Sequence, residues 1–200
     1  MKLTQLIEKE YTHVNEIEIQ TSKTSSVQAD IFAAYEEWNK DMILDSIHRK
    51  GINPKYEFFI VDSGIEKVKK IEYTKEDITA FLIQESFFEV ENFRIGYFVS
   101  ALIKHHQEKF PDIDNYVIIT EYLKGTTFGF GSFNKKNLHI IGDGGAYLGI
   151  RMQSGTIHVT GSVSGNVGHK MTGGRIEIDG DMGFISSECE GEIYHQGKKS

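Results

Sequence analysis

The sequence predicts an α+β domain over residues 1–121, followed by a short parallel β-helix over residues 122–200 with about three coils. Two observations point to this division. Only three of the 20 glycines precede residue 120, and the other 17 fall between Gly125 and Gly197. The glycine-rich part also repeats at intervals of 17–19 residues, which is the mark of a stacked architecture.

The first elements of the N-terminal domain follow from its apolar residues. Helical spacing of these residues predicts a helix over residues 27–50, which Gly51 and Pro54 end. The run KYEFFIVDSG at residues 55–64 is aromatic and β-branched and ends in turn residues, which predicts a buried strand. Its last three residues, Asp-Ser-Gly, are expected to be a simple turn, because the frame of a nucleophile turn is missing.

Three more elements complete this domain. Thr74 and Asp77 have the spacing of a capping box, which predicts a helix that starts there and runs to about Phe88. A further helix is expected over residues 94–110, because a proline follows it. The segment YVIITEY at residues 116–122 predicts a strand that leads into the β-helix.

The repeat consists of residues 137–155, 156–174 and 175–191, with a truncated copy at 192–197. Apolar residues recur in register, and they define two columns: Leu138, Ile157, Ile176 and Ile193; and Met152, Met171 and Cys189. Each unit begins with the alternation of a strand and is then interrupted by glycines at bends. One coil cannot bury its own apolar side chains, but stacked coils can, so these columns are predicted to line the interior.

The segment GSVSGNVGHKMTGGRIEIDG at residues 161–180 resembles the GXGXG repeat. That family includes the C-terminal domain of the glutamate synthase large subunit and a β-helical subunit of formylmethanofuran dehydrogenase. The resemblance covers about residues 120–197 and implies a right-handed β-helix with a structural role, holding catalytic domains or subunits in place. Glutamate synthase activity is excluded, because the chain is too short and Lys2 stands where the amidotransferase cysteine would follow Met1.

The one column that suggests chemistry comprises His139, His158, Glu177 and Tyr194. Stacked about 4.8 Å apart on an outward face, two imidazoles and a carboxylate have the ligand types of a divalent metal site such as zinc. A solvated polar ladder explains the same column and is preferred, because strand alternation already requires polar residues there. No catalytic, cofactor-binding or metal residue is therefore assigned.

Other polar residues also have simpler explanations. The stretch GDGG at residues 142–145 lacks the flanking pattern of a phosphate-binding loop. His105 and His106 are adjacent on a helix and point to different faces. Cys189 stands in a methionine column and is expected to be a buried, inert thiol.

Composition excludes several classes of function. The net charge of −7 argues against nucleic-acid binding. No apolar run approaches the length of a membrane span, and the N-terminus lacks a signal-peptide core. A single cysteine indicates a reducing compartment, so a cytoplasmic location is expected.

Three functions remain. The preferred one is a noncatalytic structural or interaction protein that binds a partner subunit or forms a homo-oligomer. Support comes from the many aromatic residues between residues 81 and 133, which are expected to leave an exposed apolar patch. The alternatives are an accessory subunit of a redox or one-carbon enzyme, which the resemblance implies, and a small enzyme with its site between the two domains. No cofactor is expected.

Overall fold

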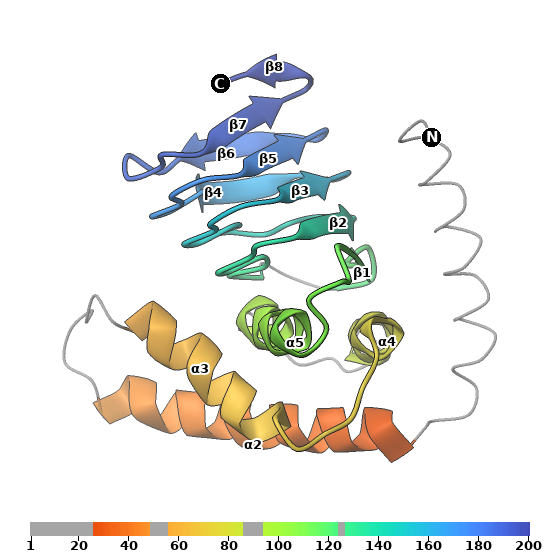
Figure 1. Ribbon diagram of the computed structural model, residues 1–200. Helices are drawn as coiled ribbons and strands as arrows, with labels where there is room; N and C mark the ends of the chain where they lie inside the picture. Colours follow the sequence, from red (N-terminus) through yellow and green to blue (C-terminus); the bar gives the residue numbers. More distant parts are fainter. Residues whose placement is uncertain (1–25, 49–55, 86–93, 124–126) are drawn as a thin grey trace.

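A β-solenoid stands on a layer of helices (Figure 1). The computed structural model describes residues 26–48, 56–85, 94–123 and 127–200. In this part of the chain the N-terminal region is helical, and the strand that follows it belongs to the solenoid. The described part of the predicted α+β domain is therefore helical, because its last strand belongs to the solenoid. The predicted β-helix is present.

Helix α2, Ser26–His48, buries one face. Ile31, Tyr35, Trp38 and Met42 lie three or four residues apart along it and are nearly inaccessible to solvent. This is the periodicity from which the helix was predicted, and the prediction is confirmed.

Helix α3, Tyr56–Val68, replaces the predicted strand over residues 55–64, and that prediction is wrong. The buried residues Ile60, Val61, Gly64 and Val68 follow a helical period. Gly64 permits the close approach of helix α5, Ile95–Lys109, because a Cβ atom there would lie 2.7 Å from Cβ of Ala101. A short apolar run does not itself distinguish a buried strand from a buried helix, and contact with neighbouring helices decides the outcome here.

Helix α4, Lys75–Glu85, begins with the predicted capping box. The N–H of Thr74 donates to Oδ2 of Asp77 (2.9 Å), and the N–H of Asp77 donates to Oγ1 of Thr74 (3.2 Å). The predicted end at Phe88 lies outside the described residues. Helix α5, Ile95–Lys109, is the predicted helix over residues 94–110 with one residue fewer at each end.

The strands form two parallel sheets, apart from one antiparallel pair at the C-terminal end. The larger sheet has the order β1-β2-β3-β5-β7-β8, and β4 and β6 form the smaller one. The strands are β1 Asn115–Ile119, β2 Asn137–Ile141, β3 Thr156–Val159, β4 Val163–Val167, β5 Arg175–Ile178, β6 Met182–Ile185, β7 Glu192–His195 and β8 Lys198–Lys199. The arrangement is a parallel β-helix of the right-handed type.

The number of coils is about four, where three were predicted. The additional coil starts at β1, which pairs with β2 from Asn115↔Asn137 to Ile119↔Ile141. The sheet of the solenoid thus begins before residue 122, at the strand predicted over residues 116–122. That strand was expected only to lead into the β-helix, but it is part of its first coil.

The strand register confirms the isoleucine-rich interior column and the polar column that begins with His139. Leu138 pairs with Ile157, Ile157 with Ile176, and Ile176 with Ile193, and all four side chains are buried. His139, His158, Glu177 and Tyr194 pair in the same order on the outer face. Each residue of the outer column directly follows a residue of the interior column along its strand. Consecutive residues of a strand point to opposite faces of the sheet, as the alternation predicted.

A recurring backbone motif shows that the repeat extends into the first coil. Three alternate residues have positive φ in each of three successive coils: Gly129, Gly131 and Phe133; Tyr147, Gly149 and Arg151; Asn166, Gly168 and Lys170. The middle position is glycine every time, with φ between 66° and 69°. The segment GFGSF at residues 129–133 is therefore the counterpart of YLGIR and NVGHK, which the sequence alignment did not include.

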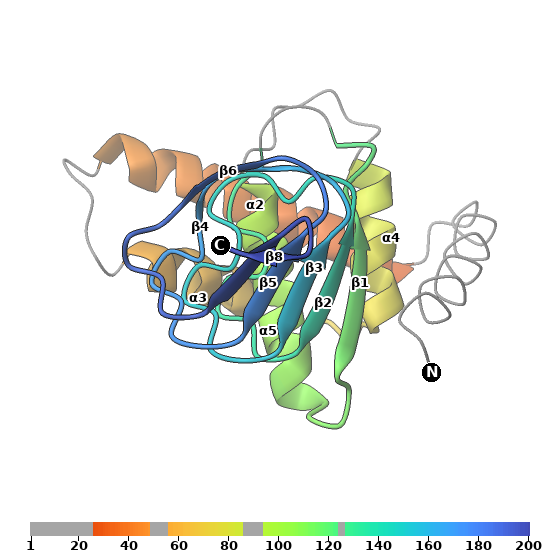
Figure 2. The ribbon, with the colours of Figure 1, turned by 90° about the horizontal axis from the view of Figure 1, so that it is seen from above.

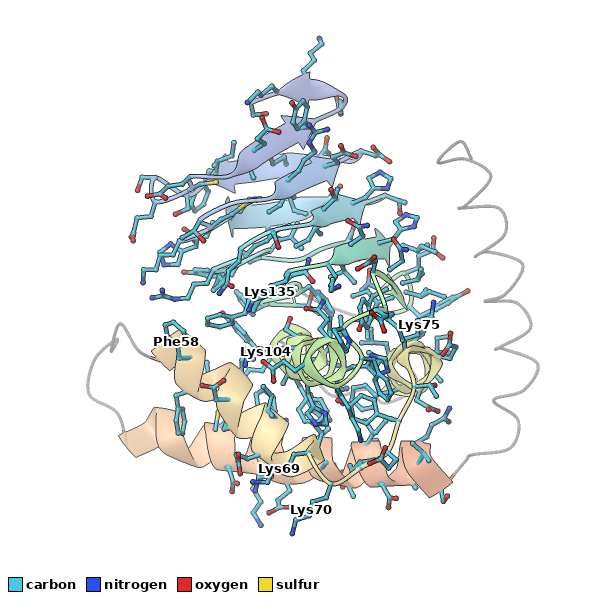
Figure 3. All side chains as sticks on the ribbon, in the orientation of Figure 1. Phe58, Lys69, Lys70, Lys75, Lys104 and Lys135 are labelled. Carbon is cyan, nitrogen blue, oxygen red and sulfur yellow. The ribbon has the colours of Figure 1, made fainter. Side chains whose placement is uncertain are left out.

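Helix α5 closes the lower end of the solenoid (Figure 1). The hydroxyl of Ser100 donates to the carbonyl of Gly129 (2.8 Å), and Nε2 of Gln107 donates to Oδ1 of Asn134 (2.9 Å). Phe58, which projects from α3 toward the coils (Figure 3), contacts Phe133 and lies under the guanidinium of Arg151. One continuous apolar core joins the helices to the coils.

Several of the aromatic residues that were expected to form an exposed patch are buried. Phe81, Phe98 and Phe130 are fully buried, and Phe133 is nearly so. Phe110 is more exposed, and Phe87, Phe88 and Phe93 lie outside the described residues. Tyr122 is 52% exposed as well, so this range contributes some exposed aromatic surface, and Phe184 of the solenoid is still more exposed (60%).

Candidate interaction site

The histidine column on the outer face of the large sheet is an internally bonded ladder. The rings of His139 and His158 are stacked, with centroids 4.9 Å apart and an angle of 19° between their planes. Nε2 of His158 lies 2.9 Å from Oδ2 of Asp179, a residue of the neighbouring outward column. The second imidazole is thus held by a ring on one side and by a carboxylate on the other.

His139 has the most unusual environment in the column. Its Nε2 atom is buried and has no hydrogen-bond partner. The pKa of His139 is lowered to about 4, chiefly by burial and also by the neighbouring His158, while Asp179 opposes the shift. A buried imidazole resists protonation because its charged form loses solvation, so His139 is neutral near pH 7.

Glu177 does not join the two histidines. Its carboxylate accepts from Arg175 (3.3 Å), and the same guanidinium reaches Glu192 (3.2 Å) and lies over the ring of Tyr194. Across the residues that the structure describes, no group of three or more His, Cys, Asp or Glu side chains could hold a metal ion. The column is arranged as a ladder of paired side chains.

The glycine-rich stretch at residues 142–145 is part of the coil backbone. The N–H of Gly142 donates to Oγ1 of Thr160, and the N–H of Gly144 donates to the carbonyl of Ser162. Asp143 accepts from the N–H of Ser162 (2.7 Å). These amides link one coil to the next.

The remaining polar residues singled out in the sequence have structural partners. His105 and His106 bond different tyrosines, Tyr73 (2.8 Å) and Tyr116 (2.9 Å), as expected of adjacent helical residues. Ser63, predicted to lie in a turn, is inside α3 instead; its hydroxyl donates to the carbonyl of Ile60 and accepts from Nε1 of Trp38. The predicted turn is absent because this segment forms helix α3 in place of the predicted strand over residues 55–64.

The upper end of the solenoid differs from its lower end. Val163, Val167 and Met171 are buried inside the third coil. Met182 and Ile185 pair with the two valines, and Cys189 takes the column position of the methionine, yet all three are only partly buried. No described strand pairs with β6 on the side away from β4, and part of the apolar interior is accessible to solvent there.

Further apolar surface and an unpaired strand edge adjoin these residues. Phe184 of β6 is 60% exposed, the largest exposure among the large apolar side chains described. In this part of the structure β6 pairs only with β4, whereas the edge of β7 is covered by the antiparallel β8. Met182, Phe184, Ile185 and Cys189, with the free edge of β6, are called the open end below.

Charged residues of both signs surround the open end. Glu188 and Glu190 are exposed in the segment between β6 and β7, and Lys198 and Lys199 are exposed on β8. Lys199 donates to Glu192 (2.7 Å), which lowers the pKa of that carboxyl, and Arg175 lowers it further. Burial raises the pKa of the Cys189 thiol, so the thiol form dominates near pH 7.

Sequence analysis did not identify the open end. It assigned Met182 and Ile185 no role, and it placed Cys189 in a buried column because the repeat alignment matched it to Met171. The repeat alignment carries no signal for this surface, because it matches column positions and does not determine how far each side chain is covered.

Comparison of the chain with protein-family models, with curated proteins and with solved structures finds no match. No helix in the described ranges is both long enough and apolar enough to cross a membrane.

Proposed function

We propose that this chain is a noncatalytic scaffold or interaction protein that presents the open end of its β-helix to a protein partner. The observation that carries the proposal is the difference between the two ends of the solenoid. Helices and a continuous apolar core close the lower end. At the upper end, partly buried interior residues, an exposed phenylalanine and a free strand edge lie together.

Each of these features favours protein contact. Exposed apolar patches mark interaction surfaces, and a phenylalanine of this exposure offers a large area to bury. A free strand edge can accept main-chain hydrogen bonds from an added strand. The ladder on the outer sheet face fits a structural role, because its charged groups pair with one another.

A second candidate is an accessory subunit of a redox or one-carbon enzyme, similar to the β-helical subunit of formylmethanofuran dehydrogenase. The pattern of residues 161–180 favours it, since it resembles the GXGXG repeat. In this case the open end would bind another subunit of the enzyme.

Site-specific photo-crosslinking in the cells that naturally produce the chain tests both candidates. A photoreactive phenylalanine replaces Phe184, and in a matched control it replaces Tyr122, which is 52% exposed and lies just after β1. We expect one recurrent adduct, identified by mass spectrometry, from position 184 and not from position 122. A metal-pterin or flavoprotein subunit in this adduct supports the second candidate, and the absence of any adduct specific to position 184 overturns the proposal.

A further inference from the structure

We propose that the open end binds the open end of a second copy of this chain, in a two-fold symmetric dimer joined end to end. This inference rests on the proposed function, because it names the partner of the same surface. Three features of the described residues support it: the direction of the strand edge, the closed lower end and the distribution of charge.

The strand edge favours a partner strand that runs antiparallel to β6. A two-fold axis that is perpendicular both to the solenoid axis and to β6 reverses the direction of this strand, so β6 of one protomer meets β6 of the other as an antiparallel pair. The two sheets end differently, since β8 pairs antiparallel with Tyr194 and His195 of β7, whereas no described strand covers the edge of β6. Antiparallel addition at β6 is therefore the available mode.

The closed lower end excludes stacking of the copies head to tail. There α5 packs against the first coil so closely that a Cβ atom at Gly96 would lie 2.4 Å from the carbonyl oxygen of Phe128. The side chains of Ser100 and Gln107 donate hydrogen bonds to Gly129 and Asn134 of the same coil. Each protomer thus offers one open end, and a pair of open ends forms a closed dimer without further growth.

The charges around the open end are self-complementary. Figure 2, which looks down on this end, shows β8 nearer the centre of the coil and the segment between β6 and β7 along its left edge. In the proposed dimer the axis is placed so that Lys198 of one protomer lies toward Glu188 and Glu190 of the other, and the reverse contact forms at the same time. Lys199, which also pairs with Glu192 of its own chain, lies next to Lys198. A surface that carries both signs in two separate places fits its own copy, because opposite charges meet twice.

Sedimentation velocity of the 200-residue chain tests the dimer directly. We expect a species of twice the 22.7 kDa chain mass that dissociates as salt is raised. Phe184→Asp places a charge in the contact and is expected to yield monomer, whereas Tyr122→Asp is the matched control and should remain a dimer. Circular dichroism of each variant verifies its fold.

Charge exchange tests the orientation. The double variants Lys198→Glu/Lys199→Glu and Glu188→Lys/Glu190→Lys should each weaken dimerisation by about tenfold or more, because like charges then meet across the axis. An equimolar mixture of the two variants should restore the dimer, since each altered segment then faces its altered counterpart. No restoration in the mixture overturns the end-to-end arrangement.

Two results separate this inference from the proposed function. A wild-type chain that is monomeric at its solubility limit, with an adduct to a different protein at position 184, overturns the dimer and leaves the interaction role in place. A dimer that persists in Phe184→Asp also overturns the inference, because the contact then lies elsewhere.

Discussion

At the scale of single residues, the interior column decides which face of each strand is buried. Ile157 lies between Leu138 and Ile176 and is inaccessible to solvent. An aspartate there would be an unpaired charge inside the stack, and we expect Ile157→Asp to lower the free energy of unfolding by about 4 kcal/mol. Chemical denaturation with guanidinium measures the loss.

Thr156→Asp is the matched control for this variant. Thr156 is the preceding residue on the same strand, is partly exposed and pairs with Arg175. We expect a change of about 0.5 kcal/mol or less. A larger loss for Thr156→Asp than for Ile157→Asp would contradict the assigned strand faces.

His139 predicts a dependence of stability on pH. Its pKa falls from 6.5 in the unfolded chain to about 4 in the fold, so the unfolded state binds more protons between these values. Stability is therefore fully retained above about pH 6.5 and is lost progressively as the pH falls toward 4. Urea denaturation at a series of pH values measures this loss.

The comparison with His139→Gln isolates the contribution of this residue. Burial also lowers the pKa of His105 and His106, so the wild-type slope contains all three groups. The variant should lose stability less steeply between pH 6.5 and 4. An identical slope in the two proteins would show that His139 does not titrate in this range.

At the scale of elements, the start of α4 is a local feature whose strength can be measured. Thr74 and Asp77 satisfy each other's backbone N–H groups. Thr74→Ala removes the hydroxyl acceptor and should lower the free energy of unfolding by about 1 kcal/mol. Thermal denaturation followed by circular dichroism measures the effect.

Two variants make the result at Thr74 specific. Thr74→Ser keeps a hydroxyl at the cap and should retain most of the stability. Lys75→Ala changes the next residue, which makes only a long ion pair with Glu76 (3.8 Å), and should change stability by about 0.5 kcal/mol or less. Equal losses in Thr74→Ala and Lys75→Ala would contradict the capping role.

Elements whose signals lie within a few residues were predicted correctly. The periodicity of α2, the capping box of α4 and the alternating strands β2, β3 and β5 all arise from local patterns. The error at residues 55–64 arose because an apolar run of this length suits both a strand and a helix. The close contact of Gly64 with Ala101 is tertiary, and the sequence does not reveal it.

The first coil escaped prediction for a different reason. Its strand, residues 115–119, has no glycine after it at the position that Gly142 and Gly161 take in later coils. The backbone motif at residues 129–133 keeps only the central glycine in common with the later coils, because the outer positions are Tyr and Arg, or Asn and Lys, there. A conformation shared by different residue types leaves little trace in an alignment.

At the scale of the whole molecule, one apolar core extends from α2 to β7. We therefore expect the helices and the coils to unfold in a single cooperative transition. Trp38, the one tryptophan of the chain, reports on the helices by fluorescence, while far-UV circular dichroism reports on both parts. Denaturation curves from the two probes should coincide, and separate midpoints would show that the parts unfold independently.

The polar column of the candidate sites was predictable because a repeat aligns its own residues. His139 and His158 had to share a face once the 19-residue spacing was recognised, and the structure places them in contact. The bonds of Glu177 to Arg175 and of His158 to Asp179 depend on side-chain rotamers, which spacing does not determine. The open end depends on how far the side chains of the last coil are covered, and this depends on tertiary packing, which the repeat spacing does not determine.

The reversal of the chain at β8 has a consequence for fibre formation. A parallel stack with a bare final strand is a template on which further chains can add without limit, as in amyloid. Lys198 and Lys199 turn back along β7 and place two charged side chains where the next rung of a fibre would start. The antiparallel return of the chain at β8 therefore interrupts parallel growth at the edge of β7, and the four-residue edge of β6 is left as the place where association can occur.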